Sequence, residues 1–565
     1  MKILFCFIRK LQCQHHFYTK RKKLLAPPFH GGDGIYRSPR PPLTLPPDPK
    51  ISMIPFLFAN LSQTGQTPAL IDSETGQTIT FSQLKTQISN LSKSLLNLNI
   101  SKNDVVLILS PNSIIYPISF LAVVSIGAIA TPANTHYTVT ELSKQIQNSS
   151  PKLIITTHQL HHKVKHFDLP CILLTPKNPS FTENRTWYYS DLVNDSPIKL
   201  KSKRPLVTQS DVAALFYSSG TTGTSKGVVL THKNFIASAM ATTSDQEFYK
   251  EPRNVFLCFL PLFHIYAMSA IIYGQLQRGN TVVVMEKYDL DKMLSAVGKY
   301  RVSHLYVVPP VVKALVKEPE VVSKYDVSSL KEIGSAAAPL GKEMMVECAK
   351  IFPKAAILQL YGLTETCAVV SMENARVGSH HSGSTGVLAP GFESKIIDVD
   401  NSKPLPPFHK GELLVRGPMV MQGYFKNKKA TEETIDEKGW LHTGDLGYFD
   451  DDGRLYIVDR LKELIKCKGF PVAPAELEEL LVSHPGITDA AVIPFPDAEA
   501  GEVPVAFVVR LSSSSISEEE VQKFVAEQVA PFKRLRRVTF VDCIPKSAAG
   551  KILRRELKQK FIPKL

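Results

Sequence analysis

The 565-residue sequence lacks several features that mark common protein classes. No two of its eight cysteines have Cys-x-x-Cys spacing, which argues against a zinc site or disulfide framework and favours a reducing compartment. No internal repeat is present. With 44% hydrophobic and 21% charged residues, the chain is neither largely disordered nor a polytopic membrane protein. It is too long for one hydrophobic core, so we expect two to four domains of about 100–200 residues each.

Acidic residues are absent from the first 32 positions, which carry seven lysines and arginines. Half of the formal net charge of +14 lies there, and the mildly basic remainder suits anionic small molecules as well as nucleic acid. Transit peptides are rich in serine, but no serine precedes Ser38, so a targeting segment and a plain disordered extension are both open interpretations. Residues 38–48 are Pro-rich and predict an extended linker, with the folded part starting near Ile51.

Charged side chains are also missing from residues 105–140, and within them residues 113–130 are apolar enough to resemble a membrane helix. Pro117 and scattered serine and glycine interrupt this stretch, and no second run of the kind exists. We therefore expect a buried strand and helix of a large core rather than a membrane span.

Short apolar strands alternate with helical patterns in the middle of the chain, with strand candidates at residues 212–217, 281–285, 303–308 and 355–361. This alternation predicts an α/β fold with mixed or parallel sheets in a large N-terminal domain. After about residue 445 come a hairpin, a helix, further strands and a capping box at Ser517, which together predict a small α+β domain. The expected regions are an extension over 1–50, a large domain over 51–458 and a mobile C-terminal domain over 459–565.

The strongest chemical signal is a run of small and hydroxylated residues in YSSGTTGTSKGVVLTH, residues 217–232. Small residues let the backbone approach a ligand closely, hydroxyl and N–H groups donate to phosphate oxygens, and Lys226 adds a positive charge. The run is not a Walker A loop, because the required Gly-Lys-Ser/Thr spacing is missing. Apolar strands flank it directly, which a flexible linker would not need.

This segment resembles the phosphate loop of the adenylate-forming enzymes, which include acyl-CoA synthetases, luciferases and the adenylation domains of peptide synthetases. Further motifs of that family match in order: YGLTET at 361–366, GWLHTGDLGYFDDDGRLYIVDR at 439–460 and PKSAAGKILRREL at 545–557. The segments at 259–268 and 461–485 are most similar to plant-type 4-coumarate–CoA ligases and their peroxisomal relatives.

The resemblance implies an ATP-dependent carboxylate–CoA ligase that makes acyl-CoA, AMP and diphosphate through an acyl-adenylate. Mg²⁺ would be the cofactor, ATP and CoA the co-substrates, and the acid a hydroxycinnamate-type or a fatty or cyclopentanone-type molecule. A carboxylate acylates poorly, whereas AMP leaves readily, and both steps place charge on the α-phosphate, where cations are needed. Alternatives are an adenylating enzyme with a non-CoA acceptor and a nucleotide-binding relative of low activity.

By the same resemblance, the nucleotide site draws on several motifs. Thr364 would bind the α-phosphate, Glu365 would hold Mg²⁺, and Asp445 would accept the ribose hydroxyls. Tyr361 would stack on adenine, with ordinary core packing as the alternative. The other expected ATP- and AMP-binding residues are Ser218, Ser219, Gly220, Thr221, Thr222, Lys226, Arg460 and Lys462.

Lys551 follows a glycine in Ala-Ala-Gly-Lys and is the expected catalytic lysine at the α-phosphate. His264 would shield the carboxylate site, unless it is a satisfied core histidine, and Lys466 matches a second phosphate-side lysine. The small domain is expected to rotate near Lys462 between the two steps, so that Lys551 leaves and a CoA tunnel forms. The expected CoA-binding residues are Lys287, Lys468 and Gly469.

The expected acyl-binding residues are Tyr266, Ala337, Gln359 and Leu360. Leu360 stands where coumarate ligases carry glycine, and a leucine adds roughly 100 Å³ at a tightly packed wall, which weakens a coumarate assignment. Pro471 stands where the relatives carry glutamine, and it supplies neither a side-chain hydrogen bond nor an N–H group. This second departure motivates the alternative of low activity.

The chain ends in Pro563-Lys564-Leu565, which resembles the peroxisomal address Ser-Lys-Leu with proline in the first place. It predicts a peroxisomal protein recognised by an import receptor, or otherwise a cytoplasmic one. We expect no nucleic-acid partner.

Overall fold

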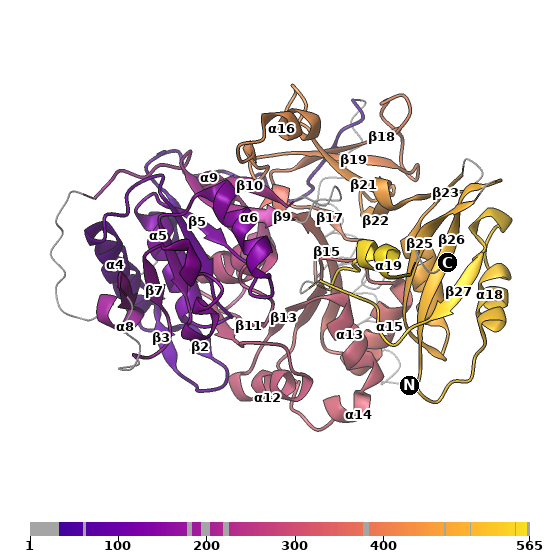
Figure 1. Cartoon of the computed structure of the whole chain (residues 1–565), viewed down its shortest axis with the longest axis horizontal. Helices are drawn as coiled ribbons and strands as arrows, with labels where there is room; N and C mark the ends of the chain where they lie inside the picture. Colours follow the sequence, from indigo (N-terminus) through magenta and orange to yellow (C-terminus); the bar gives the residue numbers. More distant parts are fainter. Residues whose placement is uncertain are drawn as a thin grey trace, which may run out of the picture.

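The computed structural model describes residues 33–59, 64–177, 184–193, 204–218, 225–376, 383–467, 470–497, 499–547 and 550–561. The large N-terminal part contains three sheets with helices packed around them, and a separate sheet lies in the C-terminal part, drawn in yellow in Figure 1. This arrangement confirms the predicted α/β class with a smaller α+β unit at the end of the chain.

An eight-stranded sheet forms one side of the large part, in the order β20-β10-β9-β5-β4-β6-β7-β8. Its strands from β9 to β8 pair in parallel, whereas β10 is antiparallel to both β9 and β20. The strands are β4 (Val105–Leu109), β5 (Ile129–Pro132), β6 (Leu153–Thr156), β7 (Cys171–Leu173), β8 (Thr186–Tyr188), β9 (Val212–Ser218), β10 (Lys226–Thr231) and β20 (Gly423–Tyr424).

Helices connect these strands, and several begin at capping boxes in which a threonine side chain accepts a backbone N–H. Thr80 caps one helix with Gln83, and Thr138 caps another with Glu141. The helices of this region are α2 (Met53–Leu57), α4 (Phe81–Asn97), α5 (Ile115–Ser125), α6 (Val139–Ser149), α7 (His158–His161), η1 (Lys165–Phe167), α8 (Tyr189–Leu192), α9 (His232–Thr242) and α10 (Ser244–Phe248).

The stretch that resembles a membrane helix lies in the core. Its residues form α5 and the start of β5, and all of 116–133 are buried. Across the described part of the chain, every helix is too short or too polar to cross a bilayer.

A nine-stranded sheet forms the middle of the molecule, in the order β17-β16-β15-β14-β13-β11-β12-β2-β3. Its strands from β15 to β2 are parallel, so their carboxyl ends meet along one edge, where ligands bind in open α/β sheets. The strands are β2 (Pro68–Asp72), β3 (Thr78–Thr80), β11 (Val255–Cys258), β12 (Thr281–Val284), β13 (His304–Val307), β14 (Glu332–Ser335), β15 (Ala356–Leu363), β16 (Ala368–Met372) and β17 (Val387–Leu388).

The helices of this middle region include a buried π-helix, η2 (Tyr266–Tyr273), which continues directly into α11 (Gly274–Arg278). A π-helical turn often marks a functional site, and η2 carries one of the expected acyl-binding residues. The others are α12 (Leu290–Tyr300), α13 (Pro309–Lys317), α14 (Pro319–Val322), α15 (Lys342–Ile351) and η3 (Thr364–Thr366).

A five-stranded antiparallel sheet, β1-β18-β19-β21-β22, closes the large part. The predicted hairpin at 448–460 is present, because β21 and β22 pair across the turn at Asp452-Gly453. The elements here are β1 (Tyr36–Arg37), β18 (Glu393–Ile397), β19 (Gly411–Arg416), α16 (Lys428–Thr434), β21 (Leu441–Phe449) and β22 (Leu455–Arg460).

The N-terminal segment requires a correction, because the folded part starts well before Ile51. Tyr36 is buried and pairs with Ser394 of β18. Arg40 is 6% exposed and donates to both carboxylate oxygens of Asp245 at 2.9 Å, and to the carbonyl of Met372 at 2.9 Å. A linker outside the fold would bury no such group, so residues 34–41 belong to the large part.

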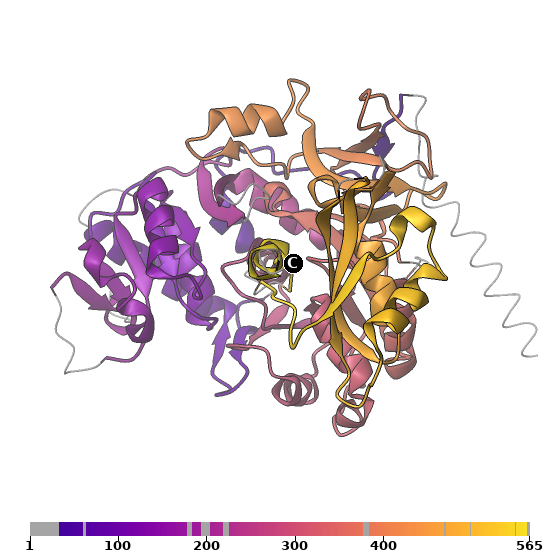
Figure 2. The same ribbon diagram turned by 45° about the vertical axis from the view of Figure 1, so that its right-hand side comes forward.

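The C-terminal unit has its own hydrophobic cores, which start after the segment that joins β22 to it. Its sheet has the order β24-β23-β26-β25, with β27 beside β26, and helices cover it (Figure 2). The predicted capping box of Ser517 and Glu520 is confirmed. The elements are η4 (Leu461–Glu463), β23 (Ile465–Cys467), β24 (Phe470–Val472), α17 (Pro474–Ser483), β25 (Ile487–Asp497), β26 (Gly501–Arg510), α18 (Glu518–Ala526), η5 (Pro531–Lys533), β27 (Arg537–Phe540) and α19 (Arg554–Phe561).

Candidate active site

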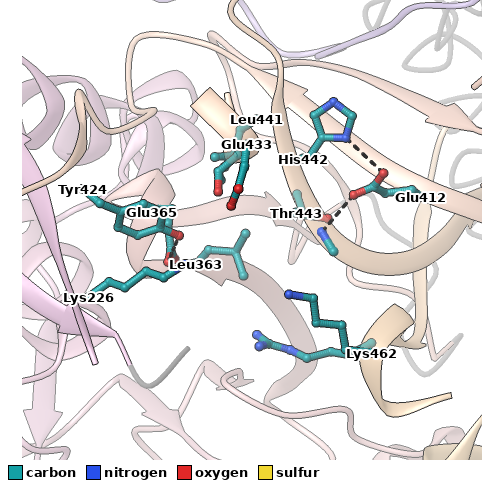
Figure 3. Close-up of a pocket in the computed structure, with 13 residues that line it drawn as sticks. Lys226, Leu363, Glu365, Glu412, Tyr424, Glu433, Leu441, His442, Thr443 and Lys462 are labelled. Atoms are coloured by element: carbon teal, nitrogen blue, oxygen red, sulfur yellow. Dashed lines mark hydrogen bonds and ion pairs between the residues drawn. The ribbon is translucent and has the colours of Figure 1, made fainter. Parts of the chain in front are cut away.

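A cavity of about 230 Å³ lies where the large sheets meet the segment leading into the C-terminal unit (Figure 3). Three cations line it: Lys226 from β10, and Arg460 and Lys462 from residues 460–462, which end β22, begin η4 and are here called the joining segment. The complete lining is Lys226, Leu363, Glu365, Glu412, Tyr424, Glu433, Thr434, Leu441, His442, Thr443, Gly444, Arg460 and Lys462. The three cations of the lining can bind the phosphate chain of a nucleotide, and the three carboxylates of the lining, Glu365, Glu412 and Glu433, can attract a cation bound to that chain.

Glu365 lies just past the carboxyl end of β15 and is held from two other strands. Ser218 Oγ at the end of β9 and Tyr424 Oη of β20 both donate to Glu365 Oε1, each at 3.0 Å. The ammonium group of Lys226 lies 4.8 Å from the centre of the Tyr424 ring. These contacts bring two expected phosphate-loop residues, Ser218 and Lys226, to the expected metal-binding carboxylate.

Asp445 lies behind the cavity lining, next to Gly444 in β21; it is 3% exposed and binds two of the other expected residues. Tyr361 Oη donates to Asp445 Oδ2 at 2.5 Å, and Arg460 Nε lies 3.3 Å from Asp445 Oδ1. The hairpin register puts Asp445 opposite Arg460, so the pair follows from the β21–β22 pairing. Burial raises the pKa of Asp445 despite the nearby Arg460 charge, and burial with the Asp445 charge holds the pKa of Tyr361 well above its ordinary value.

Glu412 and His442 line the cavity beside Asp445 and were not predicted from the sequence. His442 Nδ1 lies 3.0 Å from Glu412 Oε2, and the N–H of Gly444 donates to Glu412 Oε1 at 3.2 Å (Figure 3). The hydrogen bond to Glu412 raises the pKa of His442. By accepting the N–H of Gly444, Glu412 also fixes the backbone directly before Asp445. In the sequence, His442 could have been found from its place in His-Thr-Gly-Asp, three residues before Asp445.

Lys551 comes to the same region from the C-terminal unit. Its turn is closed by Lys551 N–H donating to Ser547 Oγ at 3.2 Å, and Gly550 at φ 77° packs against Pro310 at the start of α13. Burial and the Arg460 charge lower the pKa of Lys551, whereas the Glu463 and Asp445 charges oppose that shift. The Lys551 ammonium thus lies within reach of the charges of Arg460, Glu463 and Asp445, although Lys551 does not itself line the cavity.

His264 lies just before the π-helix η2, and Tyr266 is the first residue of that helix; the N–H of Tyr266 donates to His264 Nδ1 at 3.4 Å. Burial lowers the pKa of His264 to about 4, so its ring is neutral near pH 7. Tyr266 is 6% exposed, and its ring stacks on Tyr306 of β13 with centroids 6.4 Å apart. A neutral histidine beside stacked aromatic rings suits the carboxyl end of an acyl group.

Leu360 is buried over a glycine of the neighbouring strand. A Cβ atom on Gly334 would lie 2.8 Å from Leu360 Cδ1 and 3.0 Å from the Tyr306 ring, so Gly334 has to lack a side chain. Leucine at position 360 therefore fills the space above β14.

Gln359 and Ala337, two of the expected acyl-binding residues, lie in and beside a turn that the Gln359 side chain stabilises. Gln359 Oε1 accepts the N–H of Leu340 at 2.5 Å and its Nε2 donates to the carbonyl of Gly383 at 3.1 Å. Ala337 is exposed with φ at 73°. The Gln359 amide thus holds the turn containing Ala337, and neither residue lines the cavity.

Other expected residues lie farther from the cavity or outside the described residues. Lys287, after β12, and Lys466, on β23, are exposed and do not line it. Thr364 begins η3 between two cavity residues. The residues whose surroundings the structure does not describe are Ser219, Gly220, Thr221, Thr222, Lys468 and Gly469, together with the Pro-Lys-Leu terminus.

Metal-ligand clusters of three or more His, Cys, Asp or Glu side chains do not occur among the residues described above.

Comparison with known proteins agrees with this geometry. The AMP-binding enzyme family matches residues 57–425, and the family described as AMP-binding enzyme C-terminal domain matches residues 476–551. The probable CoA ligase CCL5 of Humulus lupulus is 44% identical, with 93% of this chain and 95% of the relative covered. Peroxisomal OPC-8:0-CoA ligase 1 of Arabidopsis thaliana is 43% identical, with 94% and 96% covered.

Solved structures show the same fold. ATP-bound MatB from Rhodopseudomonas palustris has a TM-score of 0.80 at 26% identity, with 90% of this chain and 98% of that chain covered. The o-succinylbenzoate CoA synthetase MenE of Bacillus subtilis, in complex with an acyl-adenylate intermediate, has a TM-score of 0.77 at 27% identity, with 91% and 99% covered. The chain belongs to the AMP-binding enzyme family and is an adenylate-forming enzyme of the acid–thiol ligase type.

Proposed function

We propose that the cavity activates a carboxylic acid with ATP and that the resulting acyl-adenylate is transferred to CoA. The observation that carries this proposal is the set of cations around one cavity: Lys226, Arg460 and Lys462 line it, and Lys551 lies within reach of the Arg460 charge. The carboxylate oxygen attacks the α-phosphorus, diphosphate leaves, and the CoA thiol then displaces AMP from the acyl carbon. Both steps gain from cations aimed at the α-phosphate.

The nucleotide would lie between the β9–β10 loop and the joining segment. Ser218 and Lys226 mark the ends of the phosphate-binding loop, and Thr364 would donate to the α-phosphate. Asp445 and Arg460 would hold the ribose side, and the Tyr361 ring the base. The Tyr361–Asp445 hydrogen bond supports this assignment, because it fixes both groups before a ligand arrives.

CoA would enter from the side of the small domain after that domain turns about Lys462. The exposed position of Lys287 supports this step, because a residue that serves only the second arrangement need not line the cavity in the first. Lys466 is proposed as a second phosphate-side lysine. Lys468 and Gly469 would then approach the CoA chain. The large domain is proposed to end near residue 458, although β22 continues to Arg460, and the separate core of the small domain begins at Ile465.

Mg²⁺ is the proposed cofactor, with Glu365 as its protein ligand. Both hydrogen-bond donors to this carboxylate reach Oε1, so the described contacts leave Oε2 for a cation. When bound, Mg²⁺ supplies positive charge to the phosphate oxygens. Carboxylate oxygen is a ligand that this cation prefers.

Glu365→Gln is expected to raise the Mg²⁺ concentration needed for half-maximal adenylation by about tenfold or more, because the amide carries no charge. The fold should survive, since the amide oxygen still accepts from Ser218 and Tyr424. Pyrophosphate exchange titrated with Mg²⁺ measures the effect. Glu433→Gln, on the cavity wall away from these hydrogen bonds, is the matched control. An unchanged Mg²⁺ requirement in Glu365→Gln would count against the assignment.

The acid is proposed to be a hydroxycinnamate-type or a fatty or cyclopentanone-type acid. Support comes from relatives named 4-coumarate–CoA ligase and OPC-8:0-CoA ligase. The buried position of Leu360 over Gly334 favours acids other than a planar cinnamate in its usual pose.

Leu360→Ala is expected to shift kcat/KM toward bulkier ring acids by about tenfold or more, because it opens space beside Tyr306. The same change should lower the free energy of unfolding by about 2–5 kcal/mol. Acid-panel kinetics and denaturant unfolding measure both. Ile357→Ala, on the other face of β15, should lose stability without changing acid preference. Equal shifts in the two variants would contradict the role of Leu360.

The function is tested by incubating the protein with ATP, CoA and a panel of acids. AMP and a thioester should appear together. AMP release that never depends on CoA would favour another acceptor, and nucleotide binding without pyrophosphate exchange across the panel would favour a low-activity relative. Pro471, which replaces a glutamine, motivates the second outcome.

We also propose a peroxisomal location. It rests on the Pro-Lys-Leu terminus and on a relative named as peroxisomal. A fluorescent fusion with and without the last three residues tests it: an unchanged location without them would contradict recognition by an import receptor.

A further inference from the structure

Glu463 is a partly buried carboxylate that the ligase chemistry leaves unused. It ends η4, directly after the segment that carries Arg460 and Lys462 into the cavity. Its side chain is 19% exposed, and Glu463 Oε1 lies 3.9 Å from the Lys551 ammonium. The residue therefore lies between the joining segment and the turn that presents the lysine.

The Glu463 carboxylate is itself fixed by a guanidinium group. Arg554 Nη1 donates to Glu463 Oε2, while Arg554 Nη2 donates to both oxygens of Glu478 at 2.7 and 2.8 Å. Arg554 Nε donates to the carbonyl of Val492 at 3.2 Å. A bidentate, partly buried guanidinium holds its partners in one geometry, so Glu463 has little freedom to turn away from Lys551.

We propose that Glu463 is a positioning residue for Lys551: its carboxylate holds the lysine ammonium charged and beside Arg460, a residue that lines the cavity. This inference rests on the proposed function for the reaction it serves, but the ion pair itself does not. Glu463 follows Lys462, so it moves with the small domain and stays beside Lys551 through a rotation about that residue. An incoming α-phosphate would replace Glu463 as the ion-pair partner of the ammonium, and the Lys551 side chain would need little rearrangement.

The charges around Lys551 set the sign of the expected change. Asp445 and Glu463 favour the ammonium form, whereas burial, Arg460 and Arg554 oppose it. Removing the Glu463 charge therefore lowers the pKa of Lys551 further. Because the ammonium exists only below that pKa, adenylation should be lost at a lower pH on the alkaline side.

The test is Glu463→Gln, whose amide oxygen still accepts from Arg554. Competitive reductive methylation with mass spectrometry gives the pKa of Lys551 without any catalysis, and we expect it to fall by about half a unit or more. The alkaline limb of pyrophosphate exchange should shift by the same amount. Thioester formation from a supplied acyl-adenylate should keep its pH profile, because that step does not use Lys551.

Two carboxylates serve as matched controls. Glu476 pairs with Lys533 at 2.5 Å elsewhere in the small domain, so Glu476→Gln removes the same charge and should shift neither profile. Glu478→Gln weakens the Arg554 contacts. It should lower the free energy of unfolding but shift the alkaline limb of pyrophosphate exchange only slightly. Glu463→Asp should give an intermediate shift, and it keeps the test available if the glutamine variant does not fold.

The possible failures are distinguishable. An unchanged Lys551 pKa in Glu463→Gln overturns the inference and leaves the ligase proposal intact. A labelling shift without a shift of the alkaline limb also overturns it, because the pair would then not serve the reaction. If the parent chain exchanges no pyrophosphate, the proposed function fails, while the labelling arm still decides the ion pair.

Discussion

Replacing Lys551 with alanine is expected to slow acyl-adenylate formation by about 10²-fold or more and to leave the fold intact. The amine is held by a turn closed within the C-terminal unit and lies within reach of the charges of Asp445 and Arg460. The substitution should leave this turn intact, because the turn is closed by the backbone N–H of residue 551 and not by its side chain. Pyrophosphate exchange with a saturating acid measures the effect.

The second half-reaction separates a catalytic loss from misfolding. When acyl-adenylate is supplied, Lys551→Ala should form thioester at close to the parent rate. Arg555→Ala removes an exposed cation four residues along and should behave like the parent in both assays. Near-normal pyrophosphate exchange in Lys551→Ala would refute its role.

Arg40→Ala is expected to lower the free energy of unfolding by about 3–5 kcal/mol, because it leaves the partly buried Asp245 carboxylate without its guanidinium partner. The Arg40 side chain is only 3% exposed and also donates to main-chain carbonyls, including that of Leu388 at 3.0 Å. Urea unfolding followed by circular dichroism measures the loss.

Arg37→Ala is the matched control for this change. Arg37 is three residues away and also pairs with acids, Asp33 and Glu393, but its side chain is 45% exposed. Its removal should cost no more than about 1 kcal/mol. Equal losses in the two variants would mean that Arg40 does not anchor the segment.

Local patterns predicted most of the fold. The Asp-Gly turn gave the hairpin, and the Ser517–Glu520 spacing gave the cap of α18, because each depends on neighbours in sequence. The place of Arg40 was not predictable in this way. Its partners lie at positions 245, 372 and 388, so only the folded chain brings them together.

In the candidate site, too, residues within sequence motifs could be predicted, whereas residues outside the motifs could not. Glu365 and Arg460 line one cavity, and Asp445 pairs with Arg460 beside it, since each of these residues follows from a strand end or a hairpin register. Their roles at a nucleotide stay predictions. Glu412 and Tyr424 were missed because they lie between motifs, and a lone acid or tyrosine carries no pattern. Gln359, expected to touch the acyl group, binds the backbone N–H of Leu340 and the carbonyl of Gly383, and its contact with the acyl group stays a prediction.

The burial of Tyr36 and Arg40 limits how far the chain can be shortened by proteolysis. The Tyr36 ring stacks on the Phe449 ring with centroids 4.0 Å apart, and β1, which contains Tyr36, pairs with the edge of β18. A protease that removes a leader has to cut before Tyr36. Trimming to Ile51 would bare an unpaired sheet edge, which invites pairing with other copies and aggregation.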